Sequence, residues 1–321
     1  MIRVMMLLLV VLPLTGCSET VRFSVKVTDE EGCPVTNAVV KIETLKRPVF
    51  GMESDPNNLR AIIAHAKSNG VVSVKFDSLT EHFIYWLTAE GYYRCPFREV
   101  RYELKEDHLY YVTLAEHEKE DSVVMRKVKN PIPMYSFRTY SGVRLPKENG
   151  DYGFDMKAGE LVAPFGKGKV ADFYVRKNFT EATPSAHRGT KAALFFVGKG
   201  NGAYKVKAVT DSEFRSPYAA DTNAVFKTEF RYEFPADAPC TWDSEVCDVG
   251  EDECLVLRTR CQYDAEGRLV SCHYSKLYGK LEIYSYLRFL AYAFNPTPND
   301  TNLEFDVEKN LLDKDTSPYL P

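Results

Sequence analysis

The chain has 321 residues, of which 45% are hydrophobic and 27% charged, and its formal net charge is −4. This small acidic excess argues against a nucleic-acid partner, which would select a strongly basic face. The length is sufficient for two domains with separate apolar cores, and the 20 Tyr and 19 Phe residues favour β-sheets over helices.

The N-terminus has the pattern of an export signal followed by a lipid-attachment site. Arg3 precedes an apolar run over residues 4–12, which has the length of a signal peptide and is too short to span a bilayer permanently. The following Leu-Thr-Gly-Cys matches the bacterial lipobox, in which small residues precede the cysteine that receives diacylglycerol. We therefore expect a signal peptide over residues 1–16, cleavage before Cys17 and a lipidated tether over residues 17–20.

Acylation of Cys17 would make the lipid bilayer a partner of the protein, since two or three acyl chains anchor a protein firmly. Ser18 follows the cysteine where Asp would resemble an inner-membrane retention signal. In a Gram-negative host the expected destination is therefore the outer membrane. After cleavage about 305 residues remain, and none of their apolar runs approaches the length of a membrane span. The sequence thus predicts a cell-envelope protein with a soluble body on a lipid anchor.

Residues 21–116 contain short runs that alternate apolar and polar side chains and are separated by turn residues. The pattern predicts strands over residues 21–28, 39–42, 71–76, 83–87, 99–102 and 109–114. Turns are expected at the acidic Gly segment over residues 29–32 and at Asn69-Gly70. Short strands at this spacing are typical of an antiparallel β-sandwich.

Four features follow one another in this domain: an acidic Gly turn, a Pro-Val pair, an Asn-Gly hairpin and a Gly-Tyr pair. They lie at residues 28–32, Pro34-Val35, Asn69-Gly70 and Gly91-Tyr92. In this order the segment resembles the carboxypeptidase regulatory-like (transthyretin-like) β-sandwich over most of its length. The resemblance implies a fold and a mostly non-catalytic spacer or adhesion module, with no active-site residue to carry over. The chain departs from the family by an insertion over residues 55–66, where we expect a short helix capped near Asn57 or Asn58.

Cysteine usage suits an oxidising compartment, because the chain has eight cysteines and seven remain once Cys17 is lipidated. Seven is odd, so at least one thiol is free or pairs with another molecule. Cys33 and Cys95 are the only cysteines of the first domain. They either form a disulfide between the first turn and the segment after Gly91-Tyr92 or remain two separate thiols.

Residues 117–135 begin with a charged run and continue with Asn130-Pro131-Ile132-Pro133, so we expect a linker there. Residues 136–321 then predict a second, larger antiparallel β-sandwich of no recognised family. Its expected strands lie over residues 170–175, 192–197, 203–209, 227–234, 255–263 and 268–275 and, as one long run, 283–294. The whole chain is thus predicted to be all-β, with two antiparallel β-sandwich domains in tandem after a lipoprotein signal peptide.

Two segments of the second domain carry more specific expectations. Residues 264–267 are expected to form the turn of a hairpin, with Gly267 in the left-handed backbone region. The tail after residues 295–298 is expected to be mostly coil.

The second domain also contains a series of cysteines that lie close together in the sequence. They are Cys240, Cys247, Cys254, Cys261 and Cys272. The first four are spaced by seven residues, which is not the close spacing of structural zinc, so no metal site is expected. Disulfides are the better account, since Cys261 and Cys272 fall at or near facing positions of the predicted hairpin. Cys240 with Cys247 or Cys254 would close a small loop.

Carboxylates and aromatic residues gather in the Gly-rich segment that follows the linker. The carboxylates are Asp151, Asp155, Glu160 and Asp172. Two of them could supply the acid and the base of a glycoside hydrolase. The candidate ligand-binding residues, which could hold a sugar, are Asp151, Tyr152, Phe154 and Asp155. The acidic loop over residues 248–253 could bind calcium, although such loops are more often solvated turns.

No reactive motif accompanies these residues. The six histidines form no HExxH motif, and neither a GxSxG serine motif nor a GxxxxGK[ST] phosphate loop is present. The first hypothesis is therefore a non-catalytic envelope protein, without cofactor, that binds a glycan, peptidoglycan or another protein through loops around residues 151–168. The second is a hydrolase of polysaccharide or peptidoglycan that uses carboxylates of the second domain. The third is a structural assembly subunit, suggested by the odd cysteine.

Overall fold

The computed structural model describes most of the chain. The described residues are 19–45, 59–78, 82–101, 119–138, 142–179, 190–209, 211–234, 246–250, 252–283, 285–289 and 291–312. Every helix or strand among them is a strand, so the all-β prediction is confirmed. The same residues contain no helix that is long and apolar enough to cross a membrane. The predicted signal peptide, Cys17 and Cys240 lie outside the described residues.

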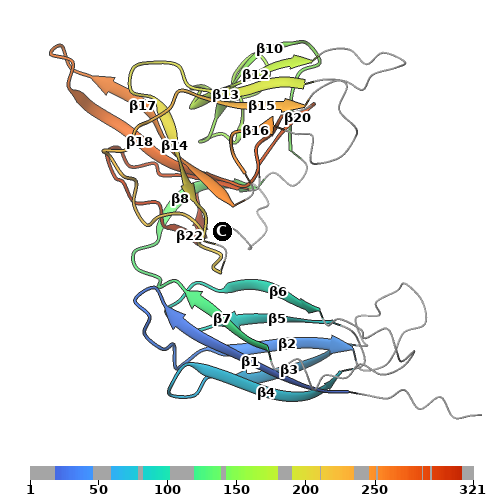
Figure 1. Ribbon diagram of the computed structural model, residues 1–321. Coiled ribbons are helices and arrows are strands. Elements are labelled where there is room, and N and C mark those ends of the chain that lie inside the picture. The colour runs from blue at the N-terminus through green and yellow to red at the C-terminus, as the bar shows by residue number, and fades with distance from the viewer. Residues whose placement is uncertain are drawn as a thin grey trace, which may run out of the picture. The chain divides into compact units, whose positions relative to one another are not determined.

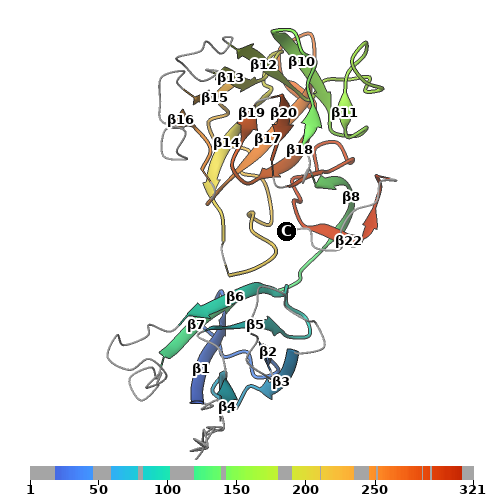
Figure 2. The ribbon, with the colours of Figure 1, turned by 90° about the vertical axis from the view of Figure 1, so that its right-hand side faces the viewer.

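The chain divides into two compact units, Met1–Lys127 and Val128–Pro321. The first unit contains two sheets, which overlap in the view of Figure 1 and stand side by side in that of Figure 2. One has the strand order β4 (Val71–Ser78), β1 (Glu19–Asp29) and β7 (Lys119–Met125). The other has the order β3 (Leu59–His65), β2 (Val39–Leu45), β5 (His82–Thr88) and β6 (Cys95–Arg101).

The core of the first unit lies between these two sheets. Side chains of β1 alternate between buried and more exposed positions, as a strand with one covered face requires. Its buried residues share one apolar cluster with residues of β2 and β5. Phe23 of β1, for example, meets Phe83 of β5 edge to face, with 5.2 Å between the ring centroids. The Tyr85 hydroxyl of β5 also donates a 2.5 Å hydrogen bond to Asp121 of β7, so a polar contact joins the sheets as well.

The helix prediction for residues 55–66 is wrong, because strand β3 (Leu59–His65) lies there. β3 pairs antiparallel with β2 from Leu45↔Leu59 to Val39↔His65, and this ladder uses the backbone groups that a helix would have paired internally. β3 is an edge strand in which Ile62 and Ala64 pack against the core while Ile63 between them is 63% exposed, so apolar residues lie on both faces and the sequence shows no alternation. The expected cap residues Asn57 and Asn58 lie outside the described residues, as does the strand predicted over residues 109–114.

The segment expected as a linker, residues 117–135, instead contributes strands to both units. β7 pairs in parallel with β1 and buries Val123 and Met125 in the first core. The first unit therefore extends to Lys127, and one of its strand pairs is parallel rather than antiparallel. The charged residues at the start of the segment favour a solvated linker, whereas the buried side chains of Val123 and Met125 attach the strand to the first core.

The second unit contains two six-stranded sheets, here called sheet I and sheet II, and one sheet of three strands. Sheet I has the order β11 (Glu160–Leu161), β10 (Gly150–Asp155), β12 (Phe173–Phe179), β13 (Thr190–Phe195), β15 (Glu229–Phe234) and β16 (Val246–Cys247). Sheet II has the order β14 (Gly202–Lys207), β17 (Glu253–Tyr263), β18 (Leu269–Tyr278), β21 (Ala291–Phe294), β8 (Ile132–Arg138) and β22 (Phe305–Asn310). The small sheet has the order β19 (Glu282–Ile283), β20 (Tyr286–Arg288) and β9 (Val143–Arg144).

Sheets I and II share one apolar cluster built from alternate residues of their strands. The ring of Phe154 in sheet I stacks on that of Phe173, with 5.1 Å between the ring centroids. It meets the ring of Tyr292 in sheet II edge to face, with 5.8 Å between the centroids. Figures 1 and 2 show the long β17–β18 hairpin of sheet II and the strands of sheet I around this interior. The opposite face of sheet II is also covered, because Ala220 and Leu303 of two loops pack with residues of β17 and β18.

The β17–β18 hairpin agrees with the prediction, and Gly267 has a φ of +79°. The strand register slips between the pairs Thr259↔His273 and Gln262↔Ser271. Arg260 lies in this interval with a φ of 54°, so the slip is a β-bulge that changes which face the following side chains occupy.

Two other expectations for the second unit differ from the structure. The run over residues 283–294 is not one strand but contributes to β19, β20 and β21. The tail is not simply coil, because β22 pairs in parallel with β8. The Asn310 side chain bonds both the backbone N–H and the carbonyl of Ser136, which fixes this last strand to the sheet.

Candidate functional site

The structure brings together two of the four candidate carboxylates, Asp155 and Asp172, on the guanidinium group of Arg260. Arg260 Nη2 lies 2.9 Å from Asp155 Oδ1 and 2.7 Å from Asp172 Oδ2, and its Nε donates to Asp172 Oδ1 at 2.8 Å. The Arg260 side chain is 15% exposed, that of Asp155 6% and that of Asp172 0%. This arginine–carboxylate cluster joins the end of β10, where Asp155 lies, and the residue before β12, Asp172, to strand β17.

Backbone donors occupy the remaining acceptor positions of Asp155. Its Oδ1 accepts the N–H of Lys157, and its Oδ2 accepts the N–H groups of Lys169 and Val170. Burial alone would raise the pKa of Asp155, but the N–H groups of Lys169 and Val170 and the positive charge of Arg260 lower it overall. An ionised Asp155 with every acceptor position filled does not suit the protonated acid that glycoside hydrolysis requires.

Asp172 is saturated in a similar way. It accepts the Thr259 hydroxyl at 2.9 Å and the N–H of Met156 at 2.9 Å, besides its two bonds from Arg260. These contacts tie sheet I to β17 through a side chain with no solvent exposure. The arginine–carboxylate cluster is therefore a polar connection within the core, and neither carboxylate has a free position from which it could attack a substrate or activate water.

The four candidate ligand-binding residues separate according to the alternation of β10. Tyr152 and Phe154 point into the core, where the Tyr152 hydroxyl donates to the carbonyl of Glu148. Asp155 belongs to the arginine–carboxylate cluster. Only Asp151 lies at the surface, where it accepts two hydrogen bonds from Arg176 at 2.9 and 3.1 Å. Asp151 therefore lies on the outer face of sheet I, the face turned away from the shared core.

Aromatic and charged side chains meet on this outer face. Tyr174 of β12 and Phe195 of β13 are paired across the two strands, and their rings stack with 5.5 Å between centroids at an angle of 25°. The Arg176 guanidinium lies 4.5 Å from the Phe195 ring centroid, within cation–π distance. We call the group formed by Tyr174, Phe195, Arg176 and Asp151 the aromatic face.

The neighbours of the aromatic face complete two rows across sheet I. Gly153 is paired with Tyr174, and Glu229 is paired with Phe195 on the other side. A Cβ on Gly153 would lie 2.9 Å from the Cβ of Ala171 and 3.3 Å from the Tyr174 ring, so a side chain there would crowd both residues. Arg231 lies in the row of Arg176 and forms a 3.2 Å ion pair with Glu229. Of this group the sequence indicates Asp151 alone, because Tyr174, Phe195 and Arg176 come from other strands and only the register places them beside it.

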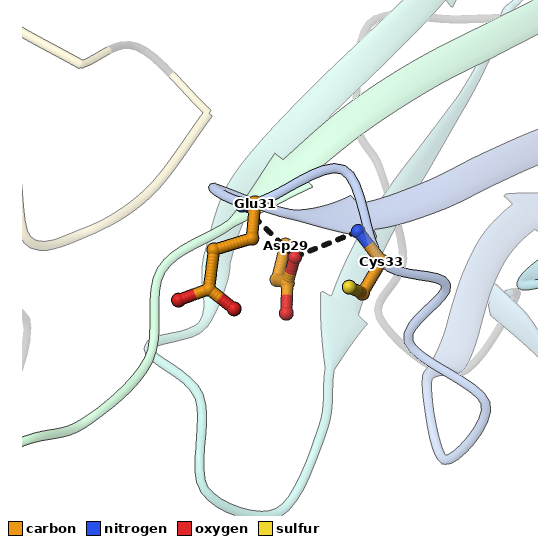
Figure 3. Close-up of side chains that lie close together, drawn as sticks. All are labelled: Asp29, Glu31 and Cys33. Carbon is orange, nitrogen blue, oxygen red and sulfur yellow. Dashed lines mark hydrogen bonds between the residues drawn. The ribbon is translucent and has the colours of Figure 1, made fainter.

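Two acidic turns offer oxygen ligands, and each holds a lysine. Asp29, Glu31 and Cys33 lie together after β1, with their possible ligand atoms within 4.8 Å of one another (Figure 3). Lys127 Nζ lies 2.9 Å from Asp29 and 3.0 Å from Glu31, so an ammonium group already balances one of the two negative charges. Its hydrogen bond to Asp29 lowers the pKa of that carboxyl group.

The acidic loop over residues 248–253 is arranged similarly. Glu253 forms a 2.9 Å ion pair with Lys205 and accepts the N–H of Gly250. Lys205 also donates to the backbone carbonyl of Asp248. In both turns the ammonium group of the lysine lies where a metal ion would bind, and this favours a structural role for the carboxylates over metal binding.

The described cysteines carry free thiols, and they lie in different environments. They are Cys33, Cys95, Cys247, Cys254, Cys261 and Cys272. Cys33 is exposed at the first turn, whereas Cys95 is buried in the first core. Cys247 packs against the core between sheets I and II, but Cys254 belongs to a cluster on the other face of sheet II. Cys261 and Cys272 alone share one apolar cluster.

Comparisons with known proteins add little to this geometry. No protein-family model matches the chain, and no curated protein matches it. Among solved structures, the chain is similar to the crystal structure of BcpA, the major pilin subunit of Bacillus cereus, at 10% sequence identity. The match covers 89% of this chain and 100% of that chain with a TM-score of 0.22. At that score the similarity carries no argument about fold or function.

Proposed function

We propose that this chain is a lipid-anchored protein of the bacterial cell envelope whose second unit binds a glycan without altering it. The observation that carries the proposal is the aromatic face of sheet I. Two rings stack there at the surface, and an arginine held by a carboxylate lies against the Phe195 ring. The ligand would be a polysaccharide or peptidoglycan strand of the envelope.

The chemistry of the aromatic face fits a saccharide. Sugar rings present C–H groups on their faces and hydroxyl groups at their edges. The rings of Tyr174 and Phe195 offer apolar contact to such faces, while Asp151 and Arg176 offer paired acceptors and donors to adjacent hydroxyls. The two rings are partly buried, and the exposed charged side chains of Asp151, Arg176 and Glu229 lie around them, whereas the centre of a protein–protein interface is depleted in charged residues. A polar ligand with small apolar surfaces therefore suits this face better than another protein.

The arginine–carboxylate cluster supports binding rather than hydrolysis. A glycoside hydrolase needs one carboxyl group that holds a proton and a second that is free to act as base or nucleophile. Asp155 and Asp172 instead share one arginine, and backbone and hydroxyl donors fill their other positions. Asp151 forms an exposed ion pair with Arg176 and lies outside the cluster.

The anchor is the second part of the proposal, and it rests on the lipobox at Cys17. The first unit, which resembles the carboxypeptidase regulatory-like module, would act as a spacer between lipid and binding unit. Labelled palmitate should enter the full chain made in a bacterial host, and the label should be lost in Cys17→Ala but kept in Cys33→Ala. Equal labelling of both variants would contradict the anchor.

The binding part is tested with residues 18–321, made without lipid and incubated with host wall and polysaccharide fractions. Retained protein and new reducing ends or muropeptides are measured in the same tubes. We expect retention without new products. New products that disappear in Asp155→Asn or Asp172→Asn would make the protein an enzyme and overturn the proposal, and so would a complete lack of retention on every fraction.

A further inference from the structure

The strand register brings Cys261 and Cys272 together at the β-bulge. Thr259 pairs with His273 before the bulge, and Gln262 pairs with Ser271 after it. Cys272 is the single residue of β18 between these pairs, and it lies opposite the two bulged residues Arg260 and Cys261 of β17. A bulge sets two residues against one in this way.

The bulge also decides which face of sheet II the Cys261 side chain occupies. Before it, Leu257 and Thr259 face the core shared with sheet I, whereas Val256 faces the other side. Strict alternation would therefore turn residue 261 toward sheet I. The left-handed conformation of Arg260 reverses the order, so Arg260 reaches Asp172 while Cys261 packs with Cys272 in the cluster on the opposite face.

Neighbouring loops hold the backbones of both cysteines. The N–H of Cys261 donates to the side-chain oxygen of Asn201 at 3.0 Å, and the N–H of Cys272 donates to that of Asn299 at 3.0 Å. Each cysteine is thus fixed by an asparagine from outside the hairpin. A disulfide requires Cα atoms within about 7 Å. Opposed residues of antiparallel strands have Cα atoms about 4.5–5.5 Å apart, and Cys261 and Cys272 lie opposite each other at the bulge and share one cluster.

The two cysteines differ in exposure. Cys272 is 1% exposed, whereas Cys261 is partly exposed and therefore the accessible member of the pair. Burial raises the pKa of Cys261 to about 11, and the adjacent Cys272 acts in the same direction. Only a small fraction of Cys261 is then thiolate near neutral pH, so uncatalysed oxidation is slow and a catalyst of disulfide exchange is needed.

We propose that Cys261 and Cys272 form a disulfide in the exported protein. The bond would link β17 to β18 at the bulge that contains Arg260. Cys261 Sγ loses its proton and attacks the disulfide of an exported thiol–disulfide oxidoreductase, which leaves one carrier thiolate and a mixed disulfide. Cys272 Sγ then loses its proton and attacks Cys261 Sγ, and the second carrier thiolate leaves. Two electrons and two protons pass to the carrier, which ends as a dithiol.

The wild-type protein purified from the envelope without reductant tests this directly. Free thiols are alkylated, the chain is digested, and the peptides that contain residues 261 and 272 are identified by mass spectrometry. We expect a linked pair that is lighter than the two free peptides by two hydrogen atoms, and both cysteines should accept the alkylating reagent only after reduction. Alkylation of both before reduction would overturn the proposal, as would linkage of either one to another cysteine.

A stability measurement gives a second readout. Reduction of the wild type should lower the midpoint of thermal unfolding by about 5–10 °C, and Cys261→Ser should remove this sensitivity to reductant. Cys247→Ser is the matched control, since Cys247 lies in a different cluster, and it should remain sensitive. If Cys261→Ser fails to fold, the peptide map of the wild type still decides. Unchanged sensitivity in a folded Cys261→Ser would contradict the assignment.

Discussion

Arg260 combines an unfavourable backbone conformation with a side chain that the core needs. A φ of 54° costs a non-glycine residue about 1 kcal/mol or more. Its guanidinium group also loses hydration in the core, and the bonds to Asp155 and Asp172 offset both costs. The carboxylates depend on Arg260 in turn, because without it two buried negative charges would face each other.

Replacing Arg260 by Leu should therefore destabilise the second unit by about 3 kcal/mol or more, since removal of one partner leaves buried charge unpaired. Urea unfolding followed by circular dichroism would measure the loss. Arg268→Ala is the matched control in the same hairpin, because the Arg268 side chain is 75% exposed and its ion pair with Asp264 lies in solvent. It should leave stability nearly unchanged, and equal losses in the two variants would refute a special role for Arg260.

The effect of Arg260→Leu should depend on pH. In the wild type the pKa of Asp155 is lowered, so the stability it contributes is present above its unfolded pKa and is lost as the pH falls through the folded value. In the variant the Arg260 charge no longer opposes the effect of burial on Asp155, and protonation of Asp155 relieves its unpaired charge. The difference in unfolding free energy between wild type and variant should shrink as the pH falls from about 7 to about 4. A difference that stays constant over this range would contradict the assignment.

Among the elements, the turn before β4 shows how one backbone position sets a strand pair. Gly70 has a φ of +77°, and a Cβ there would lie 2.5 Å from the carbonyl oxygen of Val27 in β1. Gly32 has nearly the same φ of +78° but nothing within 4 Å. The two glycines therefore separate the cost of the left-handed conformation from the cost of crowding.

Gly32→Ala should cost about 1 kcal/mol, which is the conformational term alone. Gly70→Ala should cost clearly more, about 2–4 kcal/mol, because the β1–β4 pairing must also shift to make room. Chemical unfolding of the first unit would measure both variants. Equal losses would mean that the close approach to Val27 does not matter for stability.

The elements that could be predicted are those whose signal is local. The alternation of β1 and the turn at Gly267 lie within a few residues, and both agree with the structure. β3 could not be predicted, because four of its seven residues are Leu, Arg or Ala, which favour helices, and its strand conformation comes from pairing with β2. β7 could not be predicted either, because its first residues are charged and only its pairing with β1 determines which of its residues are buried.

In the molecule as a whole, the two units have separate cores and different parts in the proposed function. Their all-β class could be predicted from composition and alternation. The aromatic face could be predicted only in part: Asp151 is a candidate residue in the sequence, but Tyr174, Phe195 and Arg176 lie beside it only through strand register, which a single sequence does not provide. For the same reason the sequence groups Asp155 and Asp172 as candidate carboxylates but does not indicate that Arg260 pairs with both of them.

The most direct test of the proposed function is the affinity of residues 18–321 for the glycan fraction that retains them. Phe195→Ala removes one ring of the aromatic face and should weaken binding about tenfold, which corresponds to about 1.4 kcal/mol. Phe165→Ala is the matched control, because Phe165 is 52% exposed in the same unit but packs on Tyr152 away from that face. Its affinity should equal that of the wild type. With both variants folded, unchanged binding by Phe195→Ala, or a loss confined to Phe165→Ala, would contradict a glycan site on sheet I.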